Sequence, residues 1–193
     1  MSGEVPSLVA ISPGDHGTGR DLAEWLSVLG RAGLPAVLIR EPHVDRITLR
    51  AVVDAACKDV PVVWIHARCA DTFGLPTHIS ARGTPPRNGQ WGRSCHTAQE
   101  VDEALAAGAA WTVLSPVWTP HSKPDDARLP LGPERFLNIA RGRPVLALGG
   151  VTVARYQMLR RGGAHGAAVL GSVLGAPSLG EATARLNQLH PRW

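Results

Sequence analysis

Pro144-Val-Leu-Ala-Leu-Gly-Gly150 and Gly166-Ala-Ala-Val-Leu-Gly171 are two apolar runs that each end in glycine, with a helix-length segment between them. Such runs are typical of buried parallel strands, whose carboxyl ends lie at the same edge of a sheet. In an eight-stranded α/β barrel the loops after the last two strands form the usual phosphate site, because their bare N–H groups point at the anion. The sequence therefore predicts phosphate-binding N–H groups at Gly149, Gly150, Gly171 and Ser172.

The length and composition suit a single globular domain, which we expect to span residues 1–193. Hydrophobic residues make up 44% of the chain and charged residues 19%. No apolar run reaches the ~18 residues that a membrane helix needs. The start, Met1-Ser-Gly-Glu-Val-Pro6, lacks the basic and apolar regions of a secretory signal. These features predict a cytoplasmic protein with no membrane partner.

The pattern of charges and cysteines limits the partners that we expect. The net charge is +4, and scattered arginines supply most of the positive charge without forming a basic block, which argues against nucleic acid and suits a small anionic ligand. Cys57, Cys69 and Cys95 form neither a CxxC pair nor a disulfide framework, and we expect reduced thiols. No His, Cys or carboxylate grouping has metal-ligand spacing, so no metal site is predicted.

Short runs rich in aliphatic and β-branched residues recur along the chain with helix-like segments between them, which is the pattern of βα units. Eight strands are predicted, at residues 8–12, 36–40, 62–66, 77–80, 92–94, 111–115, 145–148 and 166–170. Eight is the strand number of an α/β (β/α)8 TIM barrel, which is the fold that we predict. An open doubly wound sheet is the alternative, but residues 12–17 lack the glycine fingerprint that it needs after the first strand.

The clearest helix signal lies at residues 97–107, where Thr97 and Glu100 can form a capping box and Gly108 supplies a left-handed stop. Further helices are predicted at residues 21–32, 44–57, 132–140, 152–161 and 178–189. Residues 82–90 contain two prolines and two glycines and indicate a loop. The barrel is therefore expected to be small, with a short or missing fourth helix.

A long polar loop follows the sixth predicted strand, and loops at this end of a barrel form the site. In this loop Ser122 and Lys123 offer a hydroxyl and a point charge to an anion, the alternative being a solvated lysine on the surface. Arg40 ends the second strand and can either pair with Glu41 or bind phosphate or carboxylate through its guanidinium. Trp118 is the tryptophan best placed to stack on a ligand ring, although packing in the core is the usual role of tryptophan.

Proton transfer near neutral pH needs a group that titrates there, and imidazole is the usual one. Four histidines lie in or near the carboxyl ends of predicted strands. His66 ends the third strand and His121 lies in the long loop, and these two are the catalytic candidates, the alternatives being a hydrogen-bonded wall residue and a solvated side chain. His96 can instead cap the helix that follows it. His78 lies within the fourth strand, where alternation favours a packed side chain inside the barrel.

Six short motifs occur together in the second half of the chain: Gly92-Arg-Ser-Cys-His-Thr97 with Glu100, Gly108-Ala109, Ser115-Pro-Val-Trp118 with Ser122-Lys123, Leu131-Gly132, Ala147-Leu-Gly-Gly-Val151 and Gly163-Ala-His-Gly-Ala-Ala-Val169. In this order and at these separations they resemble the thiamine phosphate synthase/TenI family. The resemblance implies a (β/α)8 barrel that binds a phosphorylated thiazole at its mouth. Together with the positions considered above, this resemblance predicts five substrate-binding residues, namely Arg40, Ser94, Ser122, Lys123 and Trp118.

The resemblance implies one of two activities. The family's synthases join a thiazole phosphate to an aminopyrimidine methyl diphosphate with the help of Mg²⁺, and carry acidic residues after the third and fourth strands. These positions are Ala67 and Gly83 here. TenI-type relatives bind thiazole phosphates and move a proton to aromatise the ring, using a histidine at the end of the sixth strand. That position is Pro116 here.

The sequence thus predicts a TenI-like role in thiazole phosphate metabolism, with His66 or His121 as the proton carrier and with no cofactor. A residual thiamine phosphate synthase, which would use Mg²⁺, is one alternative. A non-catalytic or regulatory protein that binds phosphate ligands is the other. The sequence leaves the oligomeric state open.

Overall fold

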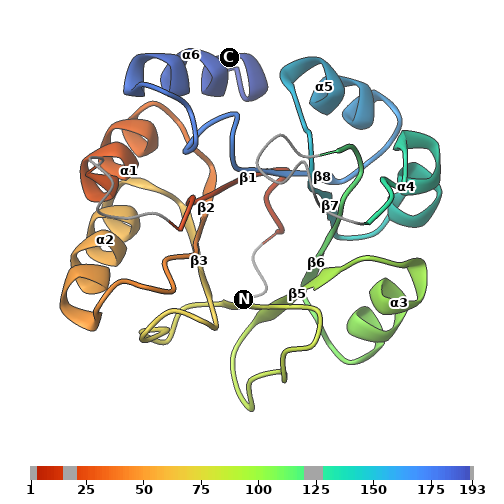
Figure 1. The fold of residues 1–193 in the computed structure, drawn as a ribbon, viewed down its shortest axis with the longest axis horizontal. Coiled ribbons are helices and arrows are strands. Elements are labelled where there is room, and N and C mark those ends of the chain that lie inside the picture. The colour runs from red at the N-terminus through yellow and green to blue at the C-terminus, as the bar shows by residue number, and fades with distance from the viewer. Residues whose placement is uncertain (1–3, 15–20, 120–127, 192–193) are drawn as a thin grey trace.

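Eight parallel strands close into a barrel in sequence order in the computed structural model (Figure 1), which describes residues 4–14, 21–119 and 128–191. The strands are β1 Leu8–Ile11, β2 Ala36–Ile39, β3 Val62–His66, β4 Thr77–Ile79, β5 Trp91–Cys95, β6 Trp111–Leu114, β7 Val145–Ala147 and β8 Gly166–Val169. The ring closes where β1 pairs with β8, Leu8 opposite Ala167. The predicted barrel is therefore confirmed, and every predicted strand overlaps an observed one.

Six helices surround the barrel in the described residues (Figure 1). They are α1 Leu22–Arg31, α2 Arg46–Asp59, α3 Ala98–Ala106, α4 Pro133–Ala140, α5 Val153–Arg161 and α6 Leu179–Leu189. Five start after a side chain that accepts a hydrogen bond from a first-turn N–H, namely Asp21, Asp45, Thr97, Thr152 and Ser178. α4 starts at a proline, which has no N–H to satisfy. None of the six combines the length and apolarity needed to cross a bilayer.

Two strands have no helix after them. The segments after β3 and β4, yellow to yellow-green at the bottom of Figure 1, consist of turns and loops. The missing helix after β4 agrees with the prediction from glycine and proline content. The structure also lacks a helix after β3. The connection is short there, since only residues 67–76 join β3 to β4.

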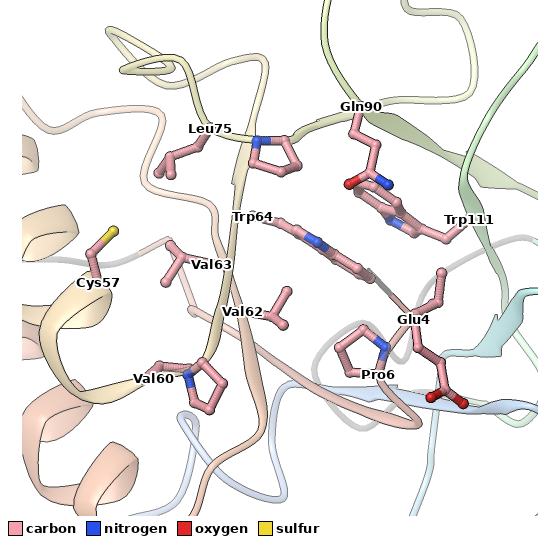
Figure 2. Close-up of a pocket in the computed structure, with 13 residues that line it drawn as sticks. Glu4, Pro6, Cys57, Val60, Val62, Val63, Trp64, Leu75, Gln90 and Trp111 are labelled. Atoms are coloured by element: carbon pink, nitrogen blue, oxygen red, sulfur yellow. The ribbon is translucent and has the colours of Figure 1, made fainter. Parts of the chain in front are cut away.

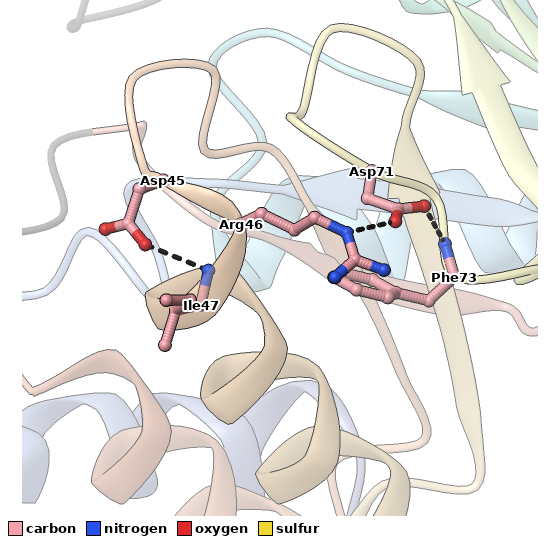
Figure 3. A network of polar contacts seen from close by, with 5 residues as sticks. All are labelled: Asp45, Arg46, Ile47, Asp71 and Phe73. Carbon is pink, nitrogen blue, oxygen red and sulfur yellow. Dashed lines mark hydrogen bonds and ion pairs between the residues drawn. The ribbon is translucent and has the colours of Figure 1, made fainter.

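The loop after β3 is held against the start of α2 by a polar network (Figure 3). Asp71 accepts hydrogen bonds from Arg46 Nε (2.7 Å) and from the backbone N–H of Phe73 (2.8 Å). The Arg46 guanidinium also lies over the Phe73 ring, with Cζ 5.4 Å from the ring centroid. Asp45 caps α2 by accepting a hydrogen bond from the N–H of Ile47 (2.9 Å). These contacts fix the loop at the rim of the barrel without a helix.

Side chains alternate along the strands between the interior of the barrel and a layer that faces the helices. The interior cluster comprises Val9, Ile11, Ala36, Leu38, Trp64, Trp111, Val113, Leu146 and Ala168. Trp64 and Trp111 stack inside it, with ring centroids 3.8 Å apart and planes at 11°. The interior is packed, and in barrels of this kind the ligand site lies at the carboxyl ends of the eight strands and the loops that follow them, which we call the mouth.

Candidate functional site

The loops after β6 and β7 touch at two glycines. Gly149 and Gly150 have φ of +98° and +63°. A Cβ on Gly149 would lie 2.9 Å from the Trp118 carbonyl oxygen, and one on Gly150 would lie 2.8 Å from Trp118 Cβ. Backbone hydrogen bonds from Val117 N to Leu148 O (2.9 Å) and from Trp118 N to Gly149 O (3.2 Å) join the two loops. Both the left-handed conformation and the close approach therefore require glycine here.

Residues 149–151 after β7 and 171–172 after β8, which we call the glycine loops, lie side by side. β7 pairs with β8, and Ser172 Oγ donates to the carbonyl of Val151 (2.8 Å). The backbone N–H groups of Gly149, Gly150, Gly171 and Ser172 donate no hydrogen bond to any described residue. Backbone donors left unpaired next to one another favour an anion. The structure thus brings the four predicted residues together in a geometry that can receive phosphate oxygens.

Arg40 and Glu41 follow β2 at the mouth. Glu41 is 1% exposed, and its Oε1 accepts a hydrogen bond from the backbone N–H of Gly14 (3.0 Å). No ion pair joins Arg40 to Glu41, and the Arg40 guanidinium has no hydrogen bond to any residue that the structure describes. Of the two sequence-based alternatives, the ion pair is therefore absent. The guanidinium remains free to meet a ligand.

His66 ends β3 inside the barrel and is 5% exposed. Its Nδ1 accepts a hydrogen bond from the backbone N–H of Arg68 (3.1 Å). Burial, and then the positive charges of Arg40 and Arg68, lower the pKa of His66 from 6.5 to about 4. At neutral pH the ring is therefore neutral, with its proton on Nε2. In this state His66 can offer Nε2–H to a ligand.

His78 is buried inside the barrel, as expected, and both of its ring nitrogens have partners. Trp111 Nε1 lies 3.1 Å from Nδ1, and Ser94 Oγ lies 2.9 Å from Nε2. The ring centroid is 5.9 Å from that of His66. Burial, and then the neighbouring His66, lower the pKa of His78 to about 3. Ser94, a predicted substrate-binding residue, therefore lies next to a neutral imidazole.

His96 contributes to the start of α3. Its backbone N–H donates to Glu100 Oε2 (2.5 Å), its Nδ1 lies 2.7 Å from the Ser115 carbonyl oxygen, and Arg128 Nη1 lies 2.8 Å from Nδ1 and 2.7 Å from Nε2. Thr97 Oγ1 accepts from the N–H of Glu100 (3.1 Å), so Thr97 caps α3 as predicted, whereas the Glu100 carboxylate accepts from the N–H of His96 and not from that of Thr97, so the capping box is only half formed. His96 thus does not cap α3, which Thr97 does, but its backbone and ring make structural contacts beside the cap.

Three predicted site residues, His121, Ser122 and Lys123, lie outside the described residues, and their roles stay predictions. Trp118 is half-buried and packs with the helix-facing hydrophobic layer. The Arg155 guanidinium lies over its ring, with Cζ 4.9 Å from the centroid. Stacking of a ligand on Trp118 also stays a prediction, and only the indole face away from Arg155 is available for it.

Sequence reasoning missed three residues that shape the mouth: Gly14, Cys69 and Arg155. Arg155 donates to the Gly150 carbonyl (2.6 Å), and Cys69 Sγ accepts from the N–H of Glu41 (3.3 Å). Gly14 has φ of +83°. A glycine so soon after β1 was a signal for a functional turn that the sequence did contain. The arginine and the thiol form no sequence pattern that could have indicated their partners.

The side chains at the strand ends do not fit a Mg²⁺ ion held by carboxylates. Position 67 is alanine, and a Cβ on Gly83 would meet Ile79 Cβ at 2.9 Å. The Gly83 carbonyl accepts a hydrogen bond from Arg93 (3.0 Å). Within the described part of the chain, no group of three or more His, Cys, Asp or Glu side chains is placed to hold a metal ion. The carboxylate oxygens that Mg²⁺ prefers are thus not supplied at these two positions.

A separate cavity of about 320 Å³ lies at the opposite end of the barrel (Figure 2). The stacked Trp64 and Trp111, several prolines and valines, and Gln90 line it, with the carboxylate of Glu4 at its edge. No arginine, lysine or histidine is among the residues that line this cavity. Its apolar walls and negative charge do not suit a phosphate.

Comparisons with known proteins find relatives of this chain by sequence. The model of a family described as thiamine monophosphate synthase matches residues 80–173. The thiamine-phosphate synthase of Roseiflexus sp. (strain RS-1) is 38% identical over 172 residues, which cover 86% of this chain and 67% of the relative. The thiamine-phosphate synthase of Geobacillus kaustophilus (strain HTA426) is 32% identical over 98 residues, covering 49% of this chain and 44% of the relative.

A solved structure supports the fold independently of sequence. Thiamine phosphate pyrophosphorylase from Pyrococcus furiosus superposes with a TM-score of 0.75, covering 95% of this chain and 93% of that chain, although the two are only 19% identical. The glycine loops end the last two strands of a closed eight-stranded barrel, at the place where the sequence motifs predicted them. With the extent and identity of the Roseiflexus match, these observations show that the chain belongs to the thiamine phosphate synthase/TenI family.

Proposed function

We propose that the mouth of this barrel binds a phosphorylated thiazole-type molecule in thiamine metabolism. The observation that carries the proposal is the set of four backbone N–H groups without acceptors among the described residues, on two adjacent loops, at Gly149, Gly150, Gly171 and Ser172. Backbone donors are already ordered by the fold, so they can bind the oxygens of a phosphate without the entropy cost of fixing long side chains. The substrate class comes from the family, whose matched members are thiamine-phosphate synthases.

Arg40 supplies a second anion contact in this proposal. β8, β1 and β2 are consecutive in the barrel, so Arg40 at the end of β2 is two strands away from the glycine loop after β8. Its guanidinium can form a bidentate contact with a carboxylate or a second phosphate group. With the phosphate on the glycine loops and the other anionic group at Arg40, we expect the ring of the ligand to meet side chains of β3 and β5, among them His66 and Ser94.

The reaction that we propose is a proton relocation on the thiazole ring, of the TenI type. One proton leaves the ring system and one returns at another position, so no atoms are gained or lost and no cofactor is needed. Among the described residues, His66 is the proposed catalytic imidazole, because Nδ1 is held by a backbone N–H and Nε2–H is left for the ligand. From the loop after β6 we propose His121 as the other proton carrier, with Ser122 and Lys123 closing over the phosphate and Trp118 against the ring.

A residual synthase activity is the second candidate. Two observations favour it: the matched relatives are thiamine-phosphate synthases, and Pro116 follows the synthase pattern. Joining the two precursors releases diphosphate, whose developing charge is normally neutralised by Mg²⁺. Since Ala67 and Gly83 supply no carboxylate, we place this activity second. A protein that binds phosphate ligands without turnover is the remaining alternative.

Calorimetry with thiazole phosphate, followed by two assays, separates these functions. Binding together with conversion between thiazole phosphate tautomers, followed by proton NMR, supports the TenI-like reaction. Diphosphate release from the two precursors in the presence of Mg²⁺ supports the synthase. Binding without either reaction identifies a non-catalytic binder. No binding of thiazole phosphate at millimolar concentration would contradict the proposal as a whole.

Arg40→Ala is expected to weaken the binding of thiazole phosphate by about ten- to a hundredfold, which corresponds to one charge-assisted contact. The thermal stability should change little, because the guanidinium bonds to no described residue. Arg82→Ala is the matched control, since Arg82 is an exposed arginine on the loop after β4 at the same end of the barrel. Equal affinities for the two variants would exclude Arg40 from the site.

A further inference from the structure

A buried polar chain runs from the core of the barrel toward the mouth. Trp111 Nε1 lies 3.1 Å from His78 Nδ1, and His78 Nε2 lies 2.9 Å from Ser94 Oγ. Trp111 is 1% exposed and His78 is 2% exposed, whereas Ser94 is only partly buried. The chain of contacts therefore ends at Ser94, on the strand β5 that helps to form the mouth.

The indole fixes the direction of both hydrogen bonds. A tryptophan N–H can only donate, so His78 Nδ1 must accept and carries no proton. A neutral His78 then holds its proton on Nε2 and donates it to Ser94 Oγ. Burial, and then the neighbouring His66, lower the pKa of His78 to about 3, which keeps the ring neutral at physiological pH.

The state of His78 determines what Ser94 can do. A hydroxyl has one hydrogen to donate and two lone pairs that accept. His78 occupies one lone pair, and the hydroxyl hydrogen meets no acceptor among the described residues. Ser94 therefore keeps its hydrogen for a group from outside this network. An unpaired hydroxyl hydrogen costs free energy when a ligand excludes water, so the ligand atom that meets it has to be an acceptor.

We propose that His78 is a positioning residue that holds the Ser94 hydroxyl as a hydrogen-bond donor toward the ligand in the mouth. The mouth then favours ligands that present an acceptor at this point, such as a ring nitrogen or an anionic oxygen. The inference rests on the proposed function, because it names the ligand chemistry that the same site recognises. It also predicts that Trp111, although it is remote from the glycine loops, influences binding through its hydrogen bond to His78.

The tautomer of His78 is tested first, without ligand. In protein labelled with ¹⁵N-histidine, the signals of His78 at neutral pH should show an unprotonated Nδ1 and a protonated Nε2. Trp111→Phe removes the only indole donor in the chain of contacts, and the preference for this tautomer should then weaken. A protonated Nδ1 in the unaltered protein would overturn the proposal.

A double-mutant cycle with thiazole phosphate tests the positioning role. Ser94→Ala is expected to weaken binding about tenfold, the value of one hydrogen bond to an anion. His78→Phe should weaken it several-fold when Ser94 is present and should have no further effect in the Ser94→Ala background, because His78 acts through the hydroxyl. Additive losses from the two changes would overturn the proposal.

Two controls accompany the cycle. Ser80→Ala removes an exposed hydroxyl at the end of β4, two residues from His78, and should leave binding unchanged. His78→Gln restores an amide donor in place of Nε2–H and should recover part of the affinity, and it replaces His78→Phe in the cycle if the phenylalanine variant does not fold. Failure of the unaltered protein to bind thiazole phosphate overturns the proposed function, whereas binding with additive losses overturns only the positioning role.

Discussion

Gly149→Ala is expected to lower the free energy of unfolding by about 3 kcal/mol and to remove phosphate binding. The residue has φ of +98°, a region that costs an L residue about 1–2 kcal/mol. The added Cβ would also lie 2.9 Å from the Trp118 carbonyl oxygen and 3.0 Å from Pro116 Cβ. Backbone and proline cannot turn aside as a flexible side chain can, so the loops after β6 and β7 must separate. Urea unfolding and calorimetry with thiazole phosphate measure the two effects.

Two other glycines separate the causes of this loss. Gly132 has φ of +76°, ψ of +156° and no described atom within 4 Å of a Cβ, so Gly132→Ala should cost only the conformational part, about 1–3 kcal/mol. Gly171 has neither a positive φ nor such a neighbour. Gly171→Ala should therefore leave stability unchanged while its methyl group weakens phosphate binding. A Gly149→Ala protein as stable as the unaltered one would contradict the close approach of the loops.

Acidification from about pH 7 to about pH 4 is expected to lower the free energy of unfolding by an amount on the order of 5 kcal/mol. The pKa is lowered to about 4 for His66 and to about 3 for His78, against 6.5 for the ordinary imidazole. The unfolded chain therefore binds more protons than the folded chain in this range. The stability that comes from the neutral rings is complete above about pH 6.5 and is lost as the pH falls through the folded pKa values.

Urea unfolding across this pH range measures the effect. His66→Gln should remove about half of the pH dependence, since one of the two neutral imidazoles is then absent. His43→Gln, which changes an exposed histidine on the loop after β2, is the control and should leave the dependence unchanged. Equal stability at both ends of the range would show that His66 and His78 are not held neutral by burial.

The order of strands and helices could be predicted because each signal is local. Apolar runs gave the strands, and every predicted helix starts within two residues of the observed one. The helix predicted from residue 44 begins at Arg46, because the Asp45 side chain caps it. The strand predicted at 92–94 extends to Trp91–Cys95, because both end residues are buried in the helix-facing layer, and such burial depends on residues distant in sequence.

The glycine loops of the site could be predicted for the same reason, since each glycine directly follows an apolar run. The partners of His78 could not be predicted, because Ser94 and Trp111 are 16 and 33 residues away and meet it only after the barrel closes. The Arg40–Glu41 ion pair failed as an alternative because Glu41 bonds to Gly14, 27 residues away. Contacts that depend on barrel closure have no period or motif in the sequence.

An NMR titration of the backbone amides with inorganic phosphate tests most directly the claim that the glycine loops bind an anion. The signals of Gly149, Gly150, Gly171 and Ser172 should shift together and saturate with one dissociation constant, since all four N–H groups contact the same ion. Arg143 and Arg160 line a pocket at the opposite end of the barrel. If the four signals stay in place while signals around this pocket shift with phosphate, the account is contradicted.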